Sequence, residues 1–162
     1  MRPFSLTAAL LASVLSISPA FATDPVSGAI SVTHAWARAT PGGVTNGAVY
    51  FEIETGPGVT DRLIGVETPA AARAEIHTHL MEDGVMKMRR VDEIALRPGS
   101  KAVLAPHGDH IMLMDLKAPL KEGDHLALKL TFQTADAIEI DAAVAAIGAA
   151  VPANESGEHH HH

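Results

Sequence analysis

The chain has 162 residues and is acidic, with 12 Lys and Arg against 19 Asp and Glu, a formal net charge of −7 and no cysteine. An acidic surface disfavours nucleic acid and anionic lipid as partners. Without cysteine the protein can form neither a disulfide framework nor a zinc, iron–sulfur or blue-copper site that depends on a thiolate.

The first predicted segment is a secretory signal peptide over residues 1–22. It has an early Arg2, an apolar run over residues 6–17 and an A-x-A cleavage site at residues 20–22, which are typical of a cleaved leader. A lipid anchor would need a cysteine, which the chain lacks. No later apolar stretch approaches the roughly 20 residues that span a bilayer. We therefore expect a soluble exported protein without a membrane span, located in a bacterial periplasm.

A flexible lead is predicted over residues 23–29 and a single domain over residues 30–150. Within the domain, short runs rich in Val, Ile, Leu and Thr alternate with polar residues and are separated by Gly, Pro and Asp. Many short alternating runs separated by turns indicate an all-β sandwich or barrel. The strands are expected at residues 30–37, 47–54, 62–68, 74–80, 85–91, 102–105, 110–116, 125–134 and 138–144.

Two regions of the predicted domain carry His and Met at alternate positions. Successive side chains of a strand point to opposite faces, so residues two apart share a face. Imidazole combined with thioether suits Cu(I), a soft ion, and is a poor ligand set for Mg, Ca or Mn. We therefore interpret these regions as a copper-binding part of a β-domain. The first cluster is His77, His79, Met86 and Met88, and the second is His110, Met112 and Met114.

The first cluster lies in a predicted hairpin, because the Asp-Gly pair at residues 83–84 is a strong turn signal. A two-residue loop at that pair would place His79 opposite Met88, whereas a loop one residue earlier would place His77 opposite Met88. Both registers put the imidazoles and thioethers on one face, with cross-strand neighbours within about 5.5 Å at Cβ. The sequence leaves the pairing open.

The second cluster follows a tight connection over residues 106–109. On its strand, Ile111 and Leu113 should face one side while His110 and Met112 face the other. A β-sandwich can bring this strand beside the hairpin, which would unite the two clusters at one metal centre.

Four of these residues resemble the signature of the PCuAC family of periplasmic copper(I) chaperones, namely a His, ten residues, a Met, twenty-one residues and then His-x-Met. His77, Met88, His110 and Met112 match this spacing. The flanking blocks that also resemble the family are residues 34–43, 84–89 and 110–132, within a span of residues 30–144.

The resemblance implies a cupredoxin-like β-barrel that binds one Cu(I) through those two His nitrogens and two Met sulfurs. It implies a chaperone, not an enzyme, that supplies the dinuclear copper centre of cytochrome c oxidase. The implied partners are the copper-bearing subunit of that oxidase or a thiol partner of the Sco type, and we expect a monomer. The alternatives are a periplasmic copper-buffering protein for tolerance and, less favoured, a small copper redox enzyme or a plain exported β-sandwich.

Further His and Met residues need separate interpretation. His79 and His107 lie close to the four ligands and are candidate auxiliary ligands, whereas Met86 and Met114 are expected to be packing residues, as Met often is. Residues 151–162 are predicted to be a disordered tail, either native or a tag. Its four terminal imidazoles suit loose capture of Cu(II). They are His159, His160, His161 and His162.

Overall fold

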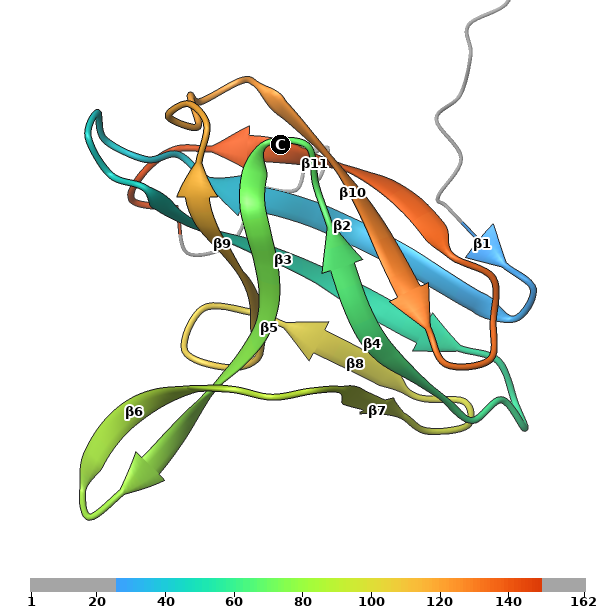
Figure 1. The fold of residues 1–162 in the computed structure, drawn as a ribbon. Coiled ribbons are helices and arrows are strands. Elements are labelled where there is room, and N and C mark those ends of the chain that lie inside the picture. The colour runs from blue at the N-terminus through green and yellow to red at the C-terminus, as the bar shows by residue number, and fades with distance from the viewer. Residues whose placement is uncertain (1–25, 150–162) are drawn as a thin grey trace, which may run out of the picture.

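The computed structural model describes residues 26–149, and within that range the chain forms strands joined by turns (Figure 1). None of these residues forms a helix long and apolar enough to cross a membrane. The signal peptide predicted over residues 1–22 and the tail predicted over residues 151–162 lie outside the described residues. The strands are β1 (Val26–Ser27), β2 (Ile30–Arg38), β3 (Asn46–Thr55), β4 (Asp61–Glu67), β5 (Ala71–Glu82), β6 (Val85–Arg90), β7 (Ile94–Leu96), β8 (Lys101–Leu104), β9 (His110–Leu116), β10 (His125–Phe132) and β11 (Ile138–Ala145).

Alternating hydrophobicity explains most of these strands. In β10, Leu126, Leu128 and Leu130 are buried, and the residues between them are exposed. In β11 the same pattern buries Ile138 and Ile140. A period of two is what a strand with one face in a core requires, so these segments were predictable.

The strands form one continuous sheet in the order β6-β5-β9-β3-β2-β11-β10-β4-β7, with β1 added to β2 and β8 added to β3. Neighbouring strands are antiparallel except for β2 and β11, which are parallel. In Figure 1, β10 and β4 cross in front of β2 and β3, so the sheet folds over itself and its inner faces enclose the core. The predicted all-β class is confirmed. The largest fully buried side chains include Phe51, Ile53, Leu63, Ile111, Leu113, Leu128 and Leu130.

Two short strands and one strand length differ from the prediction. Residues 26–27, predicted within a flexible lead, form β1 and pair with the start of β2. β7 was not predicted, because its three residues alternate only as buried, exposed and buried, which is too short a pattern to indicate a strand. β5 is longer than the predicted 74–80 because its first half pairs with β9 and its second half with β6.

A bulge in β2 turns Trp36 onto the outer face of the sheet. The register with β3 shifts between Thr33 and Trp36, and His34 has a positive φ of 53°. An extra residue in one strand reverses the alternation that follows it. Consequently Val32 faces the core before the bulge and Ala37 faces it afterwards, while Trp36 packs on the outer face opposite Tyr50, both rings being buried there.

Candidate metal centre

The β5–β6 hairpin places His79 directly opposite Met88 and His77 opposite Arg90. This is the register whose loop is the Asp-Gly pair at residues 83–84. Both loop residues have positive φ, 52° and 75°, as a type I′ hairpin turn requires. Of the two registers that the sequence allowed, the structure has the one in which Met88 faces His79 and not His77.

β9 lies on the other side of β5 and sets His110 directly opposite His77. Ile111 and Leu113 of β9 are both 0% exposed in the core. Because the strand alternates, Met112 lies with His110 on the outer face. The structure therefore brings the two sequence clusters onto one face of β6, β5 and β9.

A loop between β8 and β9 covers this face. Both strands pair with β3, one after the other, and residues 105–109 loop out between them. Inside the loop, Ala105 N donates to the Asp109 carbonyl at 2.9 Å and Gly108 N donates to the Ala105 carbonyl at 3.0 Å. His107 at its tip has a positive φ of 69°. The closed loop carries His107 and the Gly108 carbonyl to the cluster.

Four imidazoles gather where the hairpin, β9 and the loop meet. The ring centroids of His77 and His110 are 5.9 Å apart, and those of His79 and His110 are 5.1 Å apart. The His107 ring lies 6.3 Å from that of His79. The two predicted auxiliary histidines thus lie beside the predicted ligands.

Hydrogen bonds to one carbonyl orient two of these rings. The Nδ1 atoms of His79 and His110 both donate to the Gly108 carbonyl oxygen, at 3.2 Å and 3.0 Å. A carbonyl oxygen only accepts, so each Nδ1 carries the proton and the Nε2 of each neutral ring keeps its lone pair. Nε2 is therefore the atom that either ring can offer to a metal.

His77 is oriented by a carboxylate instead. Its Nε2 donates to Oε2 of Glu75 at 3.0 Å, which leaves the lone pair on Nδ1. That Nδ1 is buried and has no hydrogen-bond partner. An unsatisfied buried polar atom costs about 1–3 kcal/mol, so it needs an explanation. Metal-binding imidazoles usually donate their other N–H to a carboxylate or carbonyl, which is the arrangement of His77 and His110.

Burial and hydrogen bonding set the charges of the site. Burial lowers the pKa of His110, which favours the neutral form that ligates metal. The hydrogen bond from His77 is the main cause that lowers the pKa of Glu75, so this carboxylate stays ionised. Burial raises the pKa of Tyr50, which remains a neutral phenol.

A cavity of about 350 Å³ opens over this face. His77 is not among its lining residues, and its side chain is 14% exposed. The side of the cavity towards β2 and β3 includes Tyr50, whose ring packs 4.6 Å from that of Trp36 and carries the Arg38 guanidinium at 5.9 Å. The candidate metal ligands that line the cavity are His79, Met88, His107, His110 and Met112.

Within residues 26–149, no three His, Asp or Glu side chains form a group that could hold a metal ion by themselves. The candidate centre is therefore a mixed His and Met arrangement, in which thioether sulfurs would supply part of the coordination. Such a ligand set suits a soft ion such as Cu(I).

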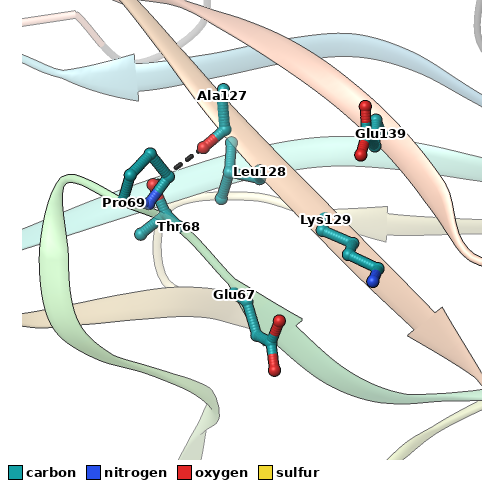
Figure 2. Close-up of a pocket in the computed structure, with 7 residues that line it drawn as sticks. All are labelled: Glu67, Thr68, Pro69, Ala127, Leu128, Lys129 and Glu139. Atoms are coloured by element: carbon teal, nitrogen blue, oxygen red, sulfur yellow. Dashed lines mark hydrogen bonds between the residues drawn. The ribbon is translucent and has the colours of Figure 1, made fainter.

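A second cavity, of about 420 Å³, lies between the end of β4 and β10 (Figure 2). Thr68 Oγ1 donates to the Ala127 carbonyl at 2.7 Å beside it. None of its lining side chains is an imidazole or a thioether, so it is separate from the metal centre. Its lining residues are Glu67, Thr68, Pro69, Ala127, Leu128, Lys129 and Glu139.

Sequence reasoning missed Glu75 and the Gly108 carbonyl. Glu75 had a usable signal, because it stands two residues before His77 on the same strand and must share its face. The Gly108 carbonyl had none, since its position depends on how the loop over residues 105–109 closes.

A cupredoxin-like sandwich with imidazoles and thioethers on one outer face defines a class of copper-binding β-domain. The chain belongs to the LpqE-like family, described as "Putative lipoprotein LpqE-like", whose model matches residues 30–144. This family is of the PCuAC type, so the predicted family is confirmed.

The chain is also similar to two curated proteins. The chain is 32% identical over 104 residues to "Putative lipoprotein Lxx21020" of Leifsonia xyli subsp. xyli, covering 64% of this chain and 61% of that protein. It is 32% identical over 112 residues to the uncharacterized protein RP573 of Rickettsia prowazekii, covering 67% of this chain and 62% of that protein. The chain spans about three fifths of the length of these curated relatives.

Solved structures agree with the fold. The copper-bound PCuAC domain from PmoF2 has a TM-score of 0.66 and 31% identity, covering 76% of this chain and 98% of that domain. The solution structure of CuI-DR1885 from Deinococcus radiodurans has a TM-score of 0.53 and 29% identity, covering 68% of this chain and 74% of that one. PCuAC neighbours have a cupredoxin-like β fold, and the predicted fold class is confirmed.

Proposed function

We propose that this protein is a periplasmic copper(I) chaperone that delivers copper for assembly of the dinuclear copper centre of cytochrome c oxidase. Its one main ion is held by His77, Met88, His110 and Met112. The recipient is the copper-bearing oxidase subunit or a Sco-type thiol partner, and the carrier acts as a monomer. Copper-bound relatives of the same family support the copper part of the proposal.

The observation that carries the proposal is the buried, unpartnered Nδ1 of His77. It lies on a ring that Glu75 orients, next to the His110 ring, whose Nε2 is left free by the Gly108 carbonyl. Two imidazole lone pairs are thus fixed by hydrogen bonds made elsewhere on each ring. A soft cation bound there would satisfy the unpartnered nitrogen.

Thioether ligands make the site suitable for carriage. A thioether is neutral and unprotonated at every physiological pH, so Cu(I) can be held without a thiolate. All six residues of β6 are exposed, and the hairpin projects from the body of the molecule at the lower left of Figure 1. A docking partner can therefore reach Met88 and take the ion by stepwise exchange to its own thiolates, which bind Cu(I) more strongly than thioethers do.

His79 has a supporting role in this proposal. It faces Met88 across the hairpin and its Nε2 is free, so it can replace a departing ligand during exchange. His107, whose ring lies 6.3 Å from that of His79, is a further auxiliary ligand in this proposal. The four terminal histidines at residues 159–162, which lie outside the described residues, are proposed as a loose Cu(II) site.

Anaerobic Cu(I) titration against a competing chelator tests the site. The wild type should take one tightly bound equivalent, and a variant with His77→Gln, Met88→Leu, His110→Gln and Met112→Leu should lose it. A matched control replaces His34 and His125, two histidines outside the cluster, by Gln and should bind like the wild type. One tight equivalent in the fourfold variant would overturn the proposal.

Transfer separates a carrier from a buffer or an enzyme. The Cu(I)-loaded protein is mixed anaerobically with a Sco-type dithiol protein or with the soluble copper-bearing oxidase domain. Stoichiometric movement of copper to the recipient supports the chaperone. Retention of copper in the presence of every such recipient would favour the buffering alternative, and multiple turnovers of a redox substrate would favour the enzyme.

A further inference from the structure

The methionines of the described chain lie on one face of three strands. Side chains at odd positions of β5 share a face with those at even positions of β6 and β9, because these positions pair directly. The buried apolar residues of the described chain include no methionine, so Met is not used to fill the core. The methionines on the shared face are Met81 on β5, Met86 and Met88 on β6, and Met112 and Met114 on β9.

Met81 and Met86 form a cross-strand pair at the tip of the hairpin. Their side chains are 65% and 49% exposed. The prediction that Met86 is a packing residue is therefore wrong, because half of that side chain is in solvent. Two exposed thioethers directly opposite each other lie within reach of one shared ion, since paired Cβ atoms are about 4.5–5.5 Å apart.

The Met81–Met86 pair lies two residues along the hairpin from the His79–Met88 pair of the candidate metal centre. Moving two residues along a strand covers about 7 Å, and two residues inward from Met81 lies His79, opposite Met88. Two further residues inward lies His77, beside His110. The same face therefore presents, from the tip inward, two thioethers, then an imidazole with a thioether, and then two imidazoles.

The charged residues near the tip belong to the other face. Glu82 binds Lys87 at 3.1 Å and also pairs with Arg89. Glu82 is adjacent to Met81 on β5, and residues 87 and 89 alternate with the methionines on β6, so these three side chains point to the opposite face of the hairpin. Their ion pairs therefore form on that opposite face. The methionine pair is thus left clear of these ion pairs, as a ligand pair for a soft cation requires.

We propose that Met81 and Met86 form a second, weaker Cu(I) site at the hairpin tip, where the ion is received before it passes inward. This inference rests on the proposed function as a copper carrier. In each step a new bond from copper to a thioether or imidazole forms as one to the previous ligand breaks, and no electron or proton moves. The His79–Met88 pair is the intermediate position.

Ag(I), a redox-inert analogue of Cu(I), tests for the site directly. The full-length protein is labelled with ¹³C at the methionine methyl groups and titrated anaerobically. The first equivalent should shift the methyl signals of Met88 and Met112, and a second should shift those of Met81 and Met86. This readout is specific to thioethers, so binding at the terminal histidines does not enter it.

The rate of Cu(I) loading tests whether Met81 and Met86 receive the ion before it reaches the main site. In a variant with Met81→Leu and Met86→Leu, transfer of Cu(I) from a thiol-bound donor should slow by roughly threefold or more, because the local effective concentration of the ion falls. The affinity of the main site should stay unchanged. The matched control is Met114→Leu, which removes a thioether from the same face away from the tip and should load at the wild-type rate.

The outcomes separate the two proposals. If the signals of Met88 and Met112 shift while those of Met81 and Met86 never do, the tip site is overturned and the carrier proposal survives. An unchanged loading rate in the double variant likewise overturns the tip site. If no methionine signal responds to Ag(I), both proposals fall together.

Discussion

On β9, Ile111 and Leu113 are wholly buried in the core, whereas Met112 and Met114 between and beyond them are only partly buried on the outer face. The two faces of this strand thus have different roles: Ile111 and Leu113 pack in the core of the sandwich, and Met112 lines the cavity at the candidate metal centre. His110 is both a packed residue and a candidate ligand, because it is 3% exposed and yet lies on the outer face with Met112. A substitution on the outer face should therefore weaken metal binding with little effect on the stability of the fold. A substitution on the core face should lower stability without removing a metal ligand.

The largest effect is expected on the core face. Leu113→Ala should lower the free energy of unfolding by about 2–5 kcal/mol, because a fully buried Leu leaves a cavity in a closely packed interior. Urea denaturation of the metal-free protein measures it. A loss below about 1 kcal/mol would show that this face is less tightly packed than the complete burial of Leu113 indicates.

Substitution of Met112, the residue before Leu113, should affect metal binding and leave stability almost unchanged. Met112→Leu should change the free energy of unfolding by less than about 1.5 kcal/mol, since the two side chains have similar volume. The Cu(I) affinity of this variant should fall by about 100-fold or more, because removing a ligand should weaken binding at least as much as removing a residue that hydrogen-bonds to a ligand. Chelator competition measures the affinity, and wild-type binding would remove Met112 from the ligand set.

Asp61 provides a comparison far from the metal face. This carboxylate is 4% exposed and accepts hydrogen bonds from the backbone N–H groups of Arg62, Thr134 and Ala135 at 2.8, 3.0 and 2.8 Å. Burial alone would raise its pKa, but the backbone donors together outweigh burial and the pKa is lowered. Asp61→Asn should cost about 1–3 kcal/mol at neutral pH without changing Cu(I) affinity.

The pH dependence of that loss follows from the lowered pKa. Because the pKa of Asp61 is lower in the folded state than in the unfolded state, the ionised carboxylate stabilises the fold. This stabilisation is fully present above the unfolded-state pKa of about 3.9 and is lost as the pH falls through the folded-state pKa. The difference between wild type and Asp61→Asn should therefore shrink in that acid window. A difference that grows on acidification would contradict the role given to the backbone donors.

The smallest effect is expected for Glu75, which touches His77 but not the ion. Glu75→Gln keeps the size of the side chain and weakens the support of the ring, so Cu(I) affinity should fall by about tenfold, the lower end for such partners. Glu139→Gln, an exposed residue outside the site, is the matched control. Equal affinities in the two variants would show that the hydrogen bond at His77 does not assist metal binding.

Local rules predicted the strands and the faces but not the closure of the site. Alternation correctly placed Ile111 and Leu113 on the opposite face of their strand from His110 and Met112, because burial on one side enforces a period of two. The pairing of His79 with Met88 stayed open, because a two-residue loop at residues 83–84 and one at residues 82–83 both place the His and Met side chains on one face of the hairpin. The loop that carries the Gly108 carbonyl depends on β8 and β9 pairing with the same strand, which is a long-range relation without a local signal.

X-ray absorption at the copper K edge of the protein loaded anaerobically with one equivalent of Cu(I) tests the central claim most directly. We expect both nitrogen and sulfur scatterers around the ion, with the sulfur contribution lost in the Met88→Leu, Met112→Leu variant. A wild-type spectrum explained by nitrogen or oxygen neighbours alone would contradict the claim that copper lies between the imidazoles and thioethers of this outer face.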